Sequence, residues 1–370
     1  MTTVGRTLRA LTPLLPAALV SADTLSRIQS LVGDVPEALA GCCGFECSLA
    51  DRTSTADFGI QVSSAAGGYD LLGGSMPQPR LPPRLLADPV WRRIGDFGHA
   101  LSAGTTLMRH VWLVFDLRGV AAEAATPNVF LGQRLRSTEG QSEVDPSMLD
   151  RSISALRGSG LPPSVRRTLD SCRAALTADM QIASVGVLLG RRTDALRVCI
   201  DGLMIDHLPT FLAAMRWDGP IDAACEVLSP FRARRHHVTV DVGATIGPRI
   251  GVECFVTHPD EALPCESFLR DLVDRQLCSA VKCEALVSWK DRPLNAECAS
   301  IPAESVASRM RLHGITLHAI WVPTIFHIKL SYEAGRRFEA KAYFGIVRRW
   351  TADLIKASST LQRWGTKPRV

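Results

Sequence analysis

Short segments in which apolar and polar residues alternate recur along this chain, and this period of two constrains the fold more than any other feature. Alternation places successive side chains on opposite faces of a β-strand. Residues 45–49 and 58–62 alternate on either side of the polar turn Asp51-Arg-Thr-Ser-Thr, which predicts a β-hairpin. The same pattern predicts four further strand pairs: 110–117 with 127–131, 183–190 with 195–200, 236–242 with 249–256, and 324–332 with 338–344.

Segments with helical spacing separate these strand pairs. Leu25, Ile28 and Leu31 share one helical face, as do Trp91, Ile94 and Phe97. Further helices are expected around Leu161-Pro-Pro, at 164–177, at 208–215, and after the last hairpin, with Trp350 and Leu354; residues 64–84, rich in Gly, Pro and Ser, predict a loop. We therefore expect an α+β protein with hairpin-rich mixed or antiparallel sheets flanked by helices.

The order of these elements occurs twice along the chain. Helix, hairpin, helix, hairpin, helix describes residues 1–158, and the same order describes residues 159–370, which end with the C-terminal hairpin and helix. This suggests an internal duplication in two α+β halves packed as one body. A chance match is the alternative, because the side chains of the two halves correspond weakly.

Composition and charge indicate an ordinary globular protein. Hydrophobic residues make up 46% of the 370 residues and charged residues 21%, which excludes a disordered chain. The net charge of +5 comes largely from basic residues near the C-terminus, including Lys341 and Arg348. Nucleic-acid binding favours a denser basic face interleaved with aromatic residues, and the chain has three tyrosines. We expect a solvated basic face and no nucleic-acid partner.

The cysteines predict neither disulfides nor a metal. There are 11, an odd number, scattered mostly through apolar segments, which is typical of reduced cysteines in the cytoplasm. Neither the group Cys42, Cys43 and Cys47 nor the pair Cys278 and Cys283 has the spacing of a zinc site. The sequence therefore predicts no bound metal.

The N-terminal region raises the question of export. Residues 11–20 are apolar like a signal peptide, but Pro13 and Pro16 interrupt them, and Ser21 begins a capped amphipathic helix. No window offers the roughly 18 uncharged apolar residues that a membrane span requires. We expect a cytoplasmic protein with no membrane association.

No established catalytic or cofactor motif occurs in the sequence. The chain lacks the phosphate-binding P-loop, the Gly-x-Gly-x-x-Gly dinucleotide motif, His-Glu-x-x-His and the Gly-x-Ser-x-Gly elbow. Adjacent His236 and His237 would point to opposite faces of a strand and so would not share a metal. The sequence thus predicts no cofactor.

The last hairpin provides the main candidate site. His327, Lys329 and Ser331 share one strand face, and Lys341 and Tyr343 share a face of the partner strand with Glu339. If the register brings these faces together, the two ammonium groups and the imidazole can bind a carboxylate or phosphate, or act in acid–base chemistry. The alternative is a solvent-facing surface on which Glu339 neutralises a lysine.

Other strands carry polar residues that could converge on a site. Asp116 shares a face with Trp112, and these two residues complete the candidate set. Asp241 shares a face with His237 and Thr239, while Glu253 stands among apolar neighbours. Carboxylates near a cleft would serve general acid–base catalysis, whereas acids at strand ends are often only bonded to turns.

Six short motifs together resemble a group of bacterial proteins encoded beside ribosomally made, modified peptides. The motifs are Val111-Trp-Leu-Val-Phe-Asp-Leu, Pro127-Asn-Val-Phe, Gly190-Arg-Arg-Thr-Asp-Ala-Leu-Arg, Gly247-Pro-Arg-Ile-Gly-Val-Glu-Cys-Phe, His327-Ile-Lys-Leu and Glu339-Ala-Lys-Ala-Tyr. They span nearly the whole chain, and none is a catalytic signature. The resemblance is to the peptide-binding proteins of crocagin-type biosynthesis, which help to form a pyrroloindoline alkaloid core. That group has an acid where Val114 stands, so no role is assigned to this position.

The resemblance implies binding of a precursor peptide and its presentation to partner biosynthetic enzymes. A groove or sheet edge would hold the extended peptide by strand addition and aromatic pockets. The alternative is a cofactor-free enzyme that catalyses cyclisation or proton transfer on the peptide, with His327 and the lysines as its reactive groups. A homodimer is compatible with either hypothesis.

Overall fold

A computed structural model describes the protein at residues 3–62, 67–76, 80–104, 108, 110–117, 126–132, 146–191, 193–232, 236–256, 265–290, 309–312 and 315–351. Its strands are β1 (Ala40–Ser48), β2 (Ala56–Val62), β3 (His110–Phe115), β4 (Asn128–Gly132), β5 (Gln181–Val187), β6 (Leu196–Asp201), β7 (His236–Val242), β8 (Ile246–Cys254), β9 (Arg309–Leu312), β10 (Ile315–Glu333) and β11 (Glu339–Thr351). Its helices are α1 (Val4–Leu11), α2 (Ala22–Val32), α3 (Gly68–Leu72), α4 (Pro83–Leu86), α5 (Pro89–Ser102), α6 (Pro146–Arg157), α7 (Pro163–Ala174), α8 (Leu208–Ala214), α9 (Ile221–Leu228), α10 (Cys265–Asp274) and α11 (Ala280–Lys290).

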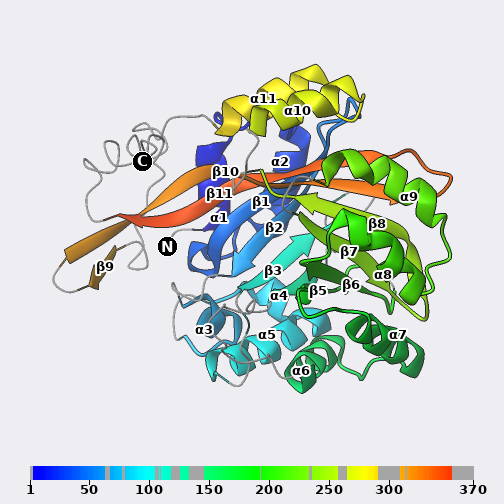
Figure 1. Cartoon of the computed structure of the whole chain (residues 1–370). Helices are drawn as coiled ribbons and strands as arrows, with labels where there is room; N and C mark the ends of the chain where they lie inside the picture. The colour runs from blue at the N-terminus through cyan, green and yellow to red at the C-terminus, as the bar shows by residue number, and fades with distance from the viewer. Residues whose placement is uncertain are drawn as a thin grey trace.

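Ten of these strands form one closed antiparallel barrel. The sheet order is β11-β1-β2-β3-β4-β5-β6-β7-β8-β10, and β10 pairs back to β11 to close the ring. β9 pairs with the first part of β10, beyond the ring. In Figure 1 this part of β10 and β11 extends away from the helices. Each ring strand therefore has a hydrogen-bonded neighbour on both sides.

The barrel is apolar outside, and both charged and aromatic side chains line its inside. Phe45, Phe58, Leu113, Val238 and Phe344 point outward and are at most 1% exposed, because helices cover them. Helices α10 and α11 lie along one side of the barrel, and α3, α5, α6 and α7 lie on the opposite side (Figure 1). The apolar face of each strand is thus buried under helices. The other face lines the lumen, where ten strands enclose more space than inward side chains fill.

Local interactions stabilise the start of α2 and hold α11 against the barrel. The Ser21 hydroxyl accepts a hydrogen bond from the Thr24 backbone N–H at 3.2 Å and caps α2 as expected. Buried Lys282 of α11 donates to the Ser48 and Thr53 carbonyls, at 2.6 and 2.7 Å, and to the Asp51 carboxylate at 3.0 Å. This ammonium ties α11 to the turn between β1 and β2.

The predicted hairpins are confirmed, including the register of the last one. His327 pairs with Tyr343, and Lys329 pairs with Lys341, so the polar faces of β10 and β11 do coincide. The broad α+β class is also confirmed. The sheets, however, are a single closed sheet, which strand alternation alone does not reveal, because an open sheet with one wet face has the same pattern.

Two predicted elements are wrong. Residues 64–84 contain α3 and the start of α4, because Leu71, Leu72 and Leu81 supply apolar contacts to the core. Trp350 lies in β11 rather than in a final helix, because pairing with β10 continues to Thr351. Leu354 lies outside the described residues.

The proposed halves share the barrel. The boundary at residue 158 falls between α6 and α7, and the strands on either side of it, β4 and β5, pair directly. Pairing of β11 with β1 joins the two halves a second time. The internal duplication stays a prediction.

The N-terminal apolar segment packs into the protein. Leu14, Leu15, Leu19 and Val20 are each at most 9% exposed and belong to the hydrophobic core. Within the described part of the chain, no helix combines the length and the apolar character needed to cross a membrane.

Candidate functional site

The lumen contains two adjoining cavities that differ in chemistry. One, of about 320 Å³, is lined mainly by aromatic rings; we call it the aromatic chamber, and its rings include Trp112, Phe130, Phe255, Phe326, His327 and Tyr343. The other, of about 250 Å³, is lined mainly by charged groups; we call it the charged ledge, and its cations are Arg191, Arg197, Arg249, Lys329 and Lys341. Glu46, Asp57, Arg191, Arg197, Thr239, Lys329 and Tyr343 line both.

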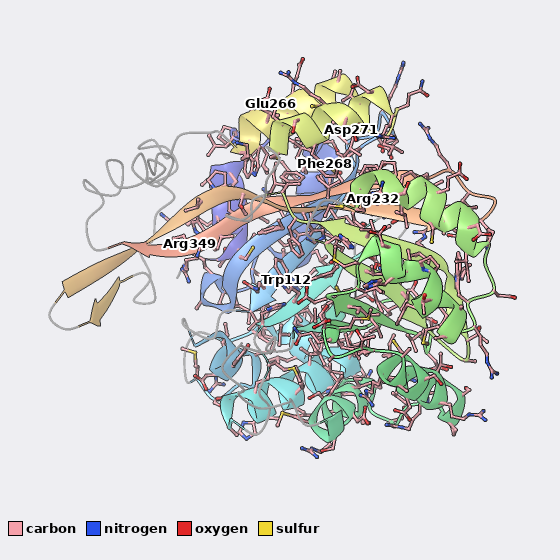
Figure 2. All side chains as sticks on the ribbon, in the orientation of Figure 1. Trp112, Arg232, Glu266, Phe268, Asp271 and Arg349 are labelled. Atoms are coloured by element: carbon pink, nitrogen blue, oxygen red, sulfur yellow. The ribbon has the colours of Figure 1, made fainter. Side chains whose placement is uncertain are left out.

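Ring contacts define the shape of the aromatic chamber. Trp112 meets Phe326 edge to face, with centroids 5.8 Å apart, and His327 stacks on Tyr343 at 4.2 Å. Figure 2 shows Trp112 in the middle of the barrel, away from the outer helices. Gly59 leaves room beside Trp112, because a Cβ at this position would make a tight contact of 3.3 Å with the ring. The chamber therefore offers space for a flat or apolar group between aromatic faces.

The cations of the charged ledge are each held by a carboxylate. Arg197 on β6 forms a two-point pair with Asp241 on β7, at 2.8 and 3.0 Å. Arg191 forms a similar pair with Asp116, at 2.6 and 2.8 Å. Lys341 donates to Glu46 at 2.8 Å. These pairs fix the direction of each charged group in the lumen.

The ion pairs also fix the protonation of the ledge. Burial alone would raise the pKa of Asp241, but the Arg197 guanidinium lowers it below its ordinary value. Arg191 has the same effect on the pKa of Asp116, again against burial. Both aspartates are therefore ionised at neutral pH, and the ledge presents alternating fixed charges.

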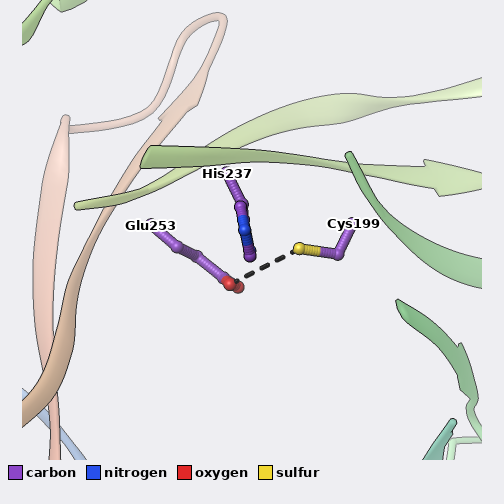
Figure 3. A group of neighbouring side chains, drawn as sticks. All are labelled: Cys199, His237 and Glu253. Carbon is purple, nitrogen blue, oxygen red and sulfur yellow. Dashed lines mark hydrogen bonds between the residues drawn. The ribbon is translucent and has the colours of Figure 1, made fainter. Parts of the chain in front are cut away.

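A second polar cluster surrounds Glu253 at the wall of the chamber. Lys329 donates to Glu253 Oε1 at 3.1 Å, and the Cys199 thiol donates to Glu253 Oε2 at 3.6 Å. Figure 3 shows Cys199, His237 and Glu253 converging from neighbouring strands. Burial would raise the pKa of Glu253, but the Lys329 ammonium lowers it, to about 2. Glu253 is thus a carboxylate.

His327 is the neutral member of this region. Burial lowers the pKa of its imidazole to about 4, although Glu253 opposes the shift. Its Nε2 atom is buried and has no hydrogen-bond partner among the described residues. Burial also raises the pKa of Tyr343 well above its ordinary value, with Glu46 adding to the effect. The stacked pair is uncharged at neutral pH.

The structure brings all six sequence-predicted site residues into the lumen. His327, Lys329, Tyr343 and Trp112 line the chamber, and Lys329, Tyr343, Lys341 and Asp116 line the ledge. The alternative of a solvent-facing surface is wrong for Lys329, which is 6% exposed. Glu339 does not neutralise these lysines, because Glu253 and Glu46 pair with them.

The expected solvated basic face is also only partly present. Arg348 is buried and pairs with Glu37 at 3.0 Å, and its guanidinium lies over the ring of Trp321. Lys341 points into the lumen. The basic residues after position 351 lie outside the described residues.

Sequence reasoning missed several lumen residues that lie on other strands. Glu46, Arg191, Arg197, Phe130 and Phe255 received no role. Glu46 is the lone charged residue of β1, and Arg197 lies between the apolar residues Leu196 and Val198 of β6. Charged residues inside mostly apolar segments recur on several strands. This pattern could have indicated that the strands enclose a common interior with polar groups.

Fold and lumen together define a class: a closed ten-stranded antiparallel barrel, covered by helices, with a cavity inside it. No family model matches the chain, and no curated protein matches it. Among solved structures, it is similar to the apo form of the prenyltransferase PriB, with 12% identity and a TM-score of 0.45 over 92% of this chain and 94% of that one. The ternary complex of PriB with L-tryptophan and dimethylallyl thiolodiphosphate gives 12% identity and a TM-score of 0.42 over the same shares. At these values the function has to be inferred from the lumen itself.

Proposed function

We propose that this protein is an enzyme that holds an aromatic substrate in the barrel and alkylates its ring with an isoprenyl-type group delivered as a diphosphate. One observation carries the proposal: an aromatic chamber and a cation-bearing ledge adjoin inside one closed barrel. The two cavities match the two halves of such a donor, an apolar chain and a phosphate group. They also provide a flat space for an aromatic acceptor.

The chamber suits the reactive carbon centre. When the allylic carbon–oxygen bond breaks, positive charge develops on the isoprenyl group. The faces of Trp112, Phe326 and Tyr343 would stabilise that charge by cation–π interaction. The surrounding barrel wall would limit access of water, which would otherwise capture the cation.

The ledge suits the leaving group. Arg191 and Arg197 each direct Nε and one Nη toward an aspartate, and a guanidinium has five N–H donors in all. The remaining donors, with the ammonium groups of Lys329 and Lys341, would bind the phosphate oxygens. Fixed donors of this kind stabilise charge that develops in the transition state.

The proton of the acceptor ring also needs a destination. The electron pair of the broken bond leaves on the diphosphate, and the ring carbon bonds to the allylic carbon. The ring then loses its proton to a base. Glu46 fits this role, because it lines both cavities and its Oε1 is held by Lys341.

The charge balance of the lumen favours a second candidate, the handling of a precursor peptide. Carboxylates accompany the five cations of the ledge: Glu46, Asp57, Asp116 and Asp241 line the ledge, Glu253 lines the chamber, and Glu333 pairs with Arg249 at 3.0 Å. A lining with both signs of charge suits the two charged ends of a zwitterionic amino acid or peptide segment. An aromatic side chain of a ribosomal peptide would occupy the chamber, for pyrroloindoline formation or another modification. This candidate does not include adding the peptide as an extra strand of the barrel, because each of the ten barrel strands already has a hydrogen-bonded neighbour on both sides.

Calorimetry with separate ligands distinguishes the two candidates. The purified chain would be titrated with dimethylallyl thiolodiphosphate, with L-tryptophan, and with a short tryptophan-containing peptide. The alkylation proposal predicts saturable binding of the thiolodiphosphate that weakens as salt increases, and weaker binding in Arg249→Gln. Peptide binding without measurable thiolodiphosphate binding would favour the second candidate. Binding of none of them would contradict both.

A further inference from the structure

We propose that Cys199, His237 and Glu253 form a zinc-type metal site in the wall of the lumen, with His327 as the fourth ligand. The inference is independent of the alkylation proposal, because none of its four ligands has a role in the proposed reaction. The sequence predicted no metal, since these residues are far apart in the chain and follow no metal-binding spacing.

The strand register brings the three residues together. They lie on β6, β7 and β8, which are consecutive strands of the barrel, and all point into the lumen. His237 and Glu253 are direct cross-strand partners. One ligand atom from each residue lies within 4.8 Å of the others (Figure 3). Bonds of about 2.0 Å to nitrogen and 2.3 Å to sulfur place tetrahedral ligands roughly 3.5 Å apart, so small side-chain rotations suffice.

The fourth position is indicated by an unsatisfied atom. His327 Nε2 is buried, has no hydrogen-bond partner among the described residues, and lies 4.0 Å from Glu253 Oε2. A buried ring nitrogen without a partner costs free energy unless something binds it. A metal ion between these two atoms would satisfy it.

Neighbouring residues hold the side chains of the proposed ligands in place. Asp201 Oδ1 lies 3.3 Å from His237 Nε2, and Gln181 donates to Asp201 Oδ2 at 3.4 Å. A carboxylate on the far nitrogen of a metal-bound histidine fixes the ring and leaves the other nitrogen for the metal. Lys329 similarly holds Glu253 Oε1, so that Oε2 faces Cys199.

The donor set indicates which metal would bind. A thiolate, imidazoles and one carboxylate suit Zn²⁺ or its spectroscopic substitute Co²⁺, whereas Mg²⁺ and Ca²⁺ prefer oxygen ligands. Binding would replace the thiol proton that now points toward Glu253. A filled site would also position the imidazole of His327 beside Tyr343, at the edge of the aromatic chamber.

Co²⁺ titration of the chelator-treated full chain tests the site without substrate. The wild type should bind one equivalent and develop the charge-transfer absorption of a cobalt–thiolate bond. Cys199→Ser should abolish that absorption and weaken Co²⁺ binding about 100-fold or more. Asp201→Asn should weaken Co²⁺ binding by about tenfold while the absorption remains, because Asp201 holds the His237 ring and does not itself bind the metal.

Cys225→Ser is the control, because Cys225 is a partly buried thiol outside the lumen. It should leave both the absorption and the affinity unchanged. Circular dichroism would confirm that each variant folds. Co²⁺ bound without thiolate absorption, or with an affinity that Cys199→Ser does not change, would overturn the proposal. So would a wild type that binds no Co²⁺. Because no prenyl donor or acceptor is present, this outcome is separate from failure of the alkylation proposal.

Discussion

Trp112 on β3 contacts Phe326 on β10 edge to face, at 5.8 Å and 77°, although these strands are not neighbours in the sheet. The contact therefore crosses the lumen. It closes the aromatic chamber on one side and fixes both rings.

Replacing Trp112 by Leu should weaken binding of an aromatic ligand. The variant loses one face of the chamber, and we expect the dissociation constant for a bound indole to increase about tenfold, equivalent to about 1.4 kcal/mol. Calorimetry with L-tryptophan measures this. Phe338→Leu, an equivalent change outside the lumen, should have no effect. Equal affinities in all three proteins would show that the ligand does not use the chamber.

The pair Arg197 and Asp241 should be strongly coupled in stability. Arg197→Met leaves a largely buried carboxylate without its partner, so we expect a loss of about 2–4 kcal/mol in the free energy of unfolding. Asp241→Asn should cost a similar amount, and the double variant much less than the sum. Denaturant unfolding of the four proteins gives the coupling energy. Additive losses would mean that the ion pair is not formed in solution.

Lys282 should contribute to stability through the contacts that tie α11 to the β1–β2 turn. Its ammonium makes three hydrogen bonds and is 4% exposed as a side chain. Lys282→Met leaves two carbonyls and Asp51 without this donor, and we expect a loss of about 2–3 kcal/mol. Glu284→Gln on the exposed side of the same helix should cost less than about 0.5 kcal/mol. A thermal or denaturant unfolding series compares them.

Asp150 should contribute to the loss of stability in acid. Burial opposes ionisation, but Arg173 and Arg166 lower the pKa of Asp150 below its ordinary 3.8. A carboxyl whose pKa is lower in the folded state stabilises the fold above about pH 4, and that contribution is lost as the pH decreases through the folded-state pKa. Asp150→Asn should therefore be less stable than wild type at pH 7, by about 1 kcal/mol.

The difference between Asp150→Asn and wild type should shrink as the pH decreases from about 4 toward 2. Asp170, whose side chain is 55% exposed, pairs with the same Arg173, and Asp170→Asn serves as the control. It should behave like wild type throughout. A difference for Asp150→Asn that stays constant with pH would argue against the assigned ionisation.

How far the sequence predicts this protein depends on the kind of contact involved. The hairpin of β10 and β11 was predictable, because alternation and a local turn determine which of its residues face each other. The pairing of β11 with β1 was not, because it joins strands almost 300 positions apart and leaves no local pattern. When the closure of the barrel is not known, the polar face of a strand cannot be distinguished from a solvent-facing surface.

The same limit explains the candidate site. His327, Lys329, Lys341 and Tyr343 were found together because they lie on one hairpin. Their partners Glu253 and Glu46 lie on β8 and β1, and only the three-dimensional ring brings them into contact. Buried charges on strands are costly unless they are paired, so each lone charge in an apolar strand implied a partner that the sequence did not identify.

A product analysis tests most directly whether this protein alkylates an aromatic acceptor. The purified protein would be incubated with dimethylallyl diphosphate and L-tryptophan, or the tryptophan-containing peptide, and the acceptor would be examined by mass spectrometry. We expect an acceptor that has gained one isoprenyl group in place of a ring hydrogen, with release of diphosphate, and loss of this product in Glu46→Gln. An unmodified acceptor in every reaction, from a folded protein that binds both substrates, would contradict it.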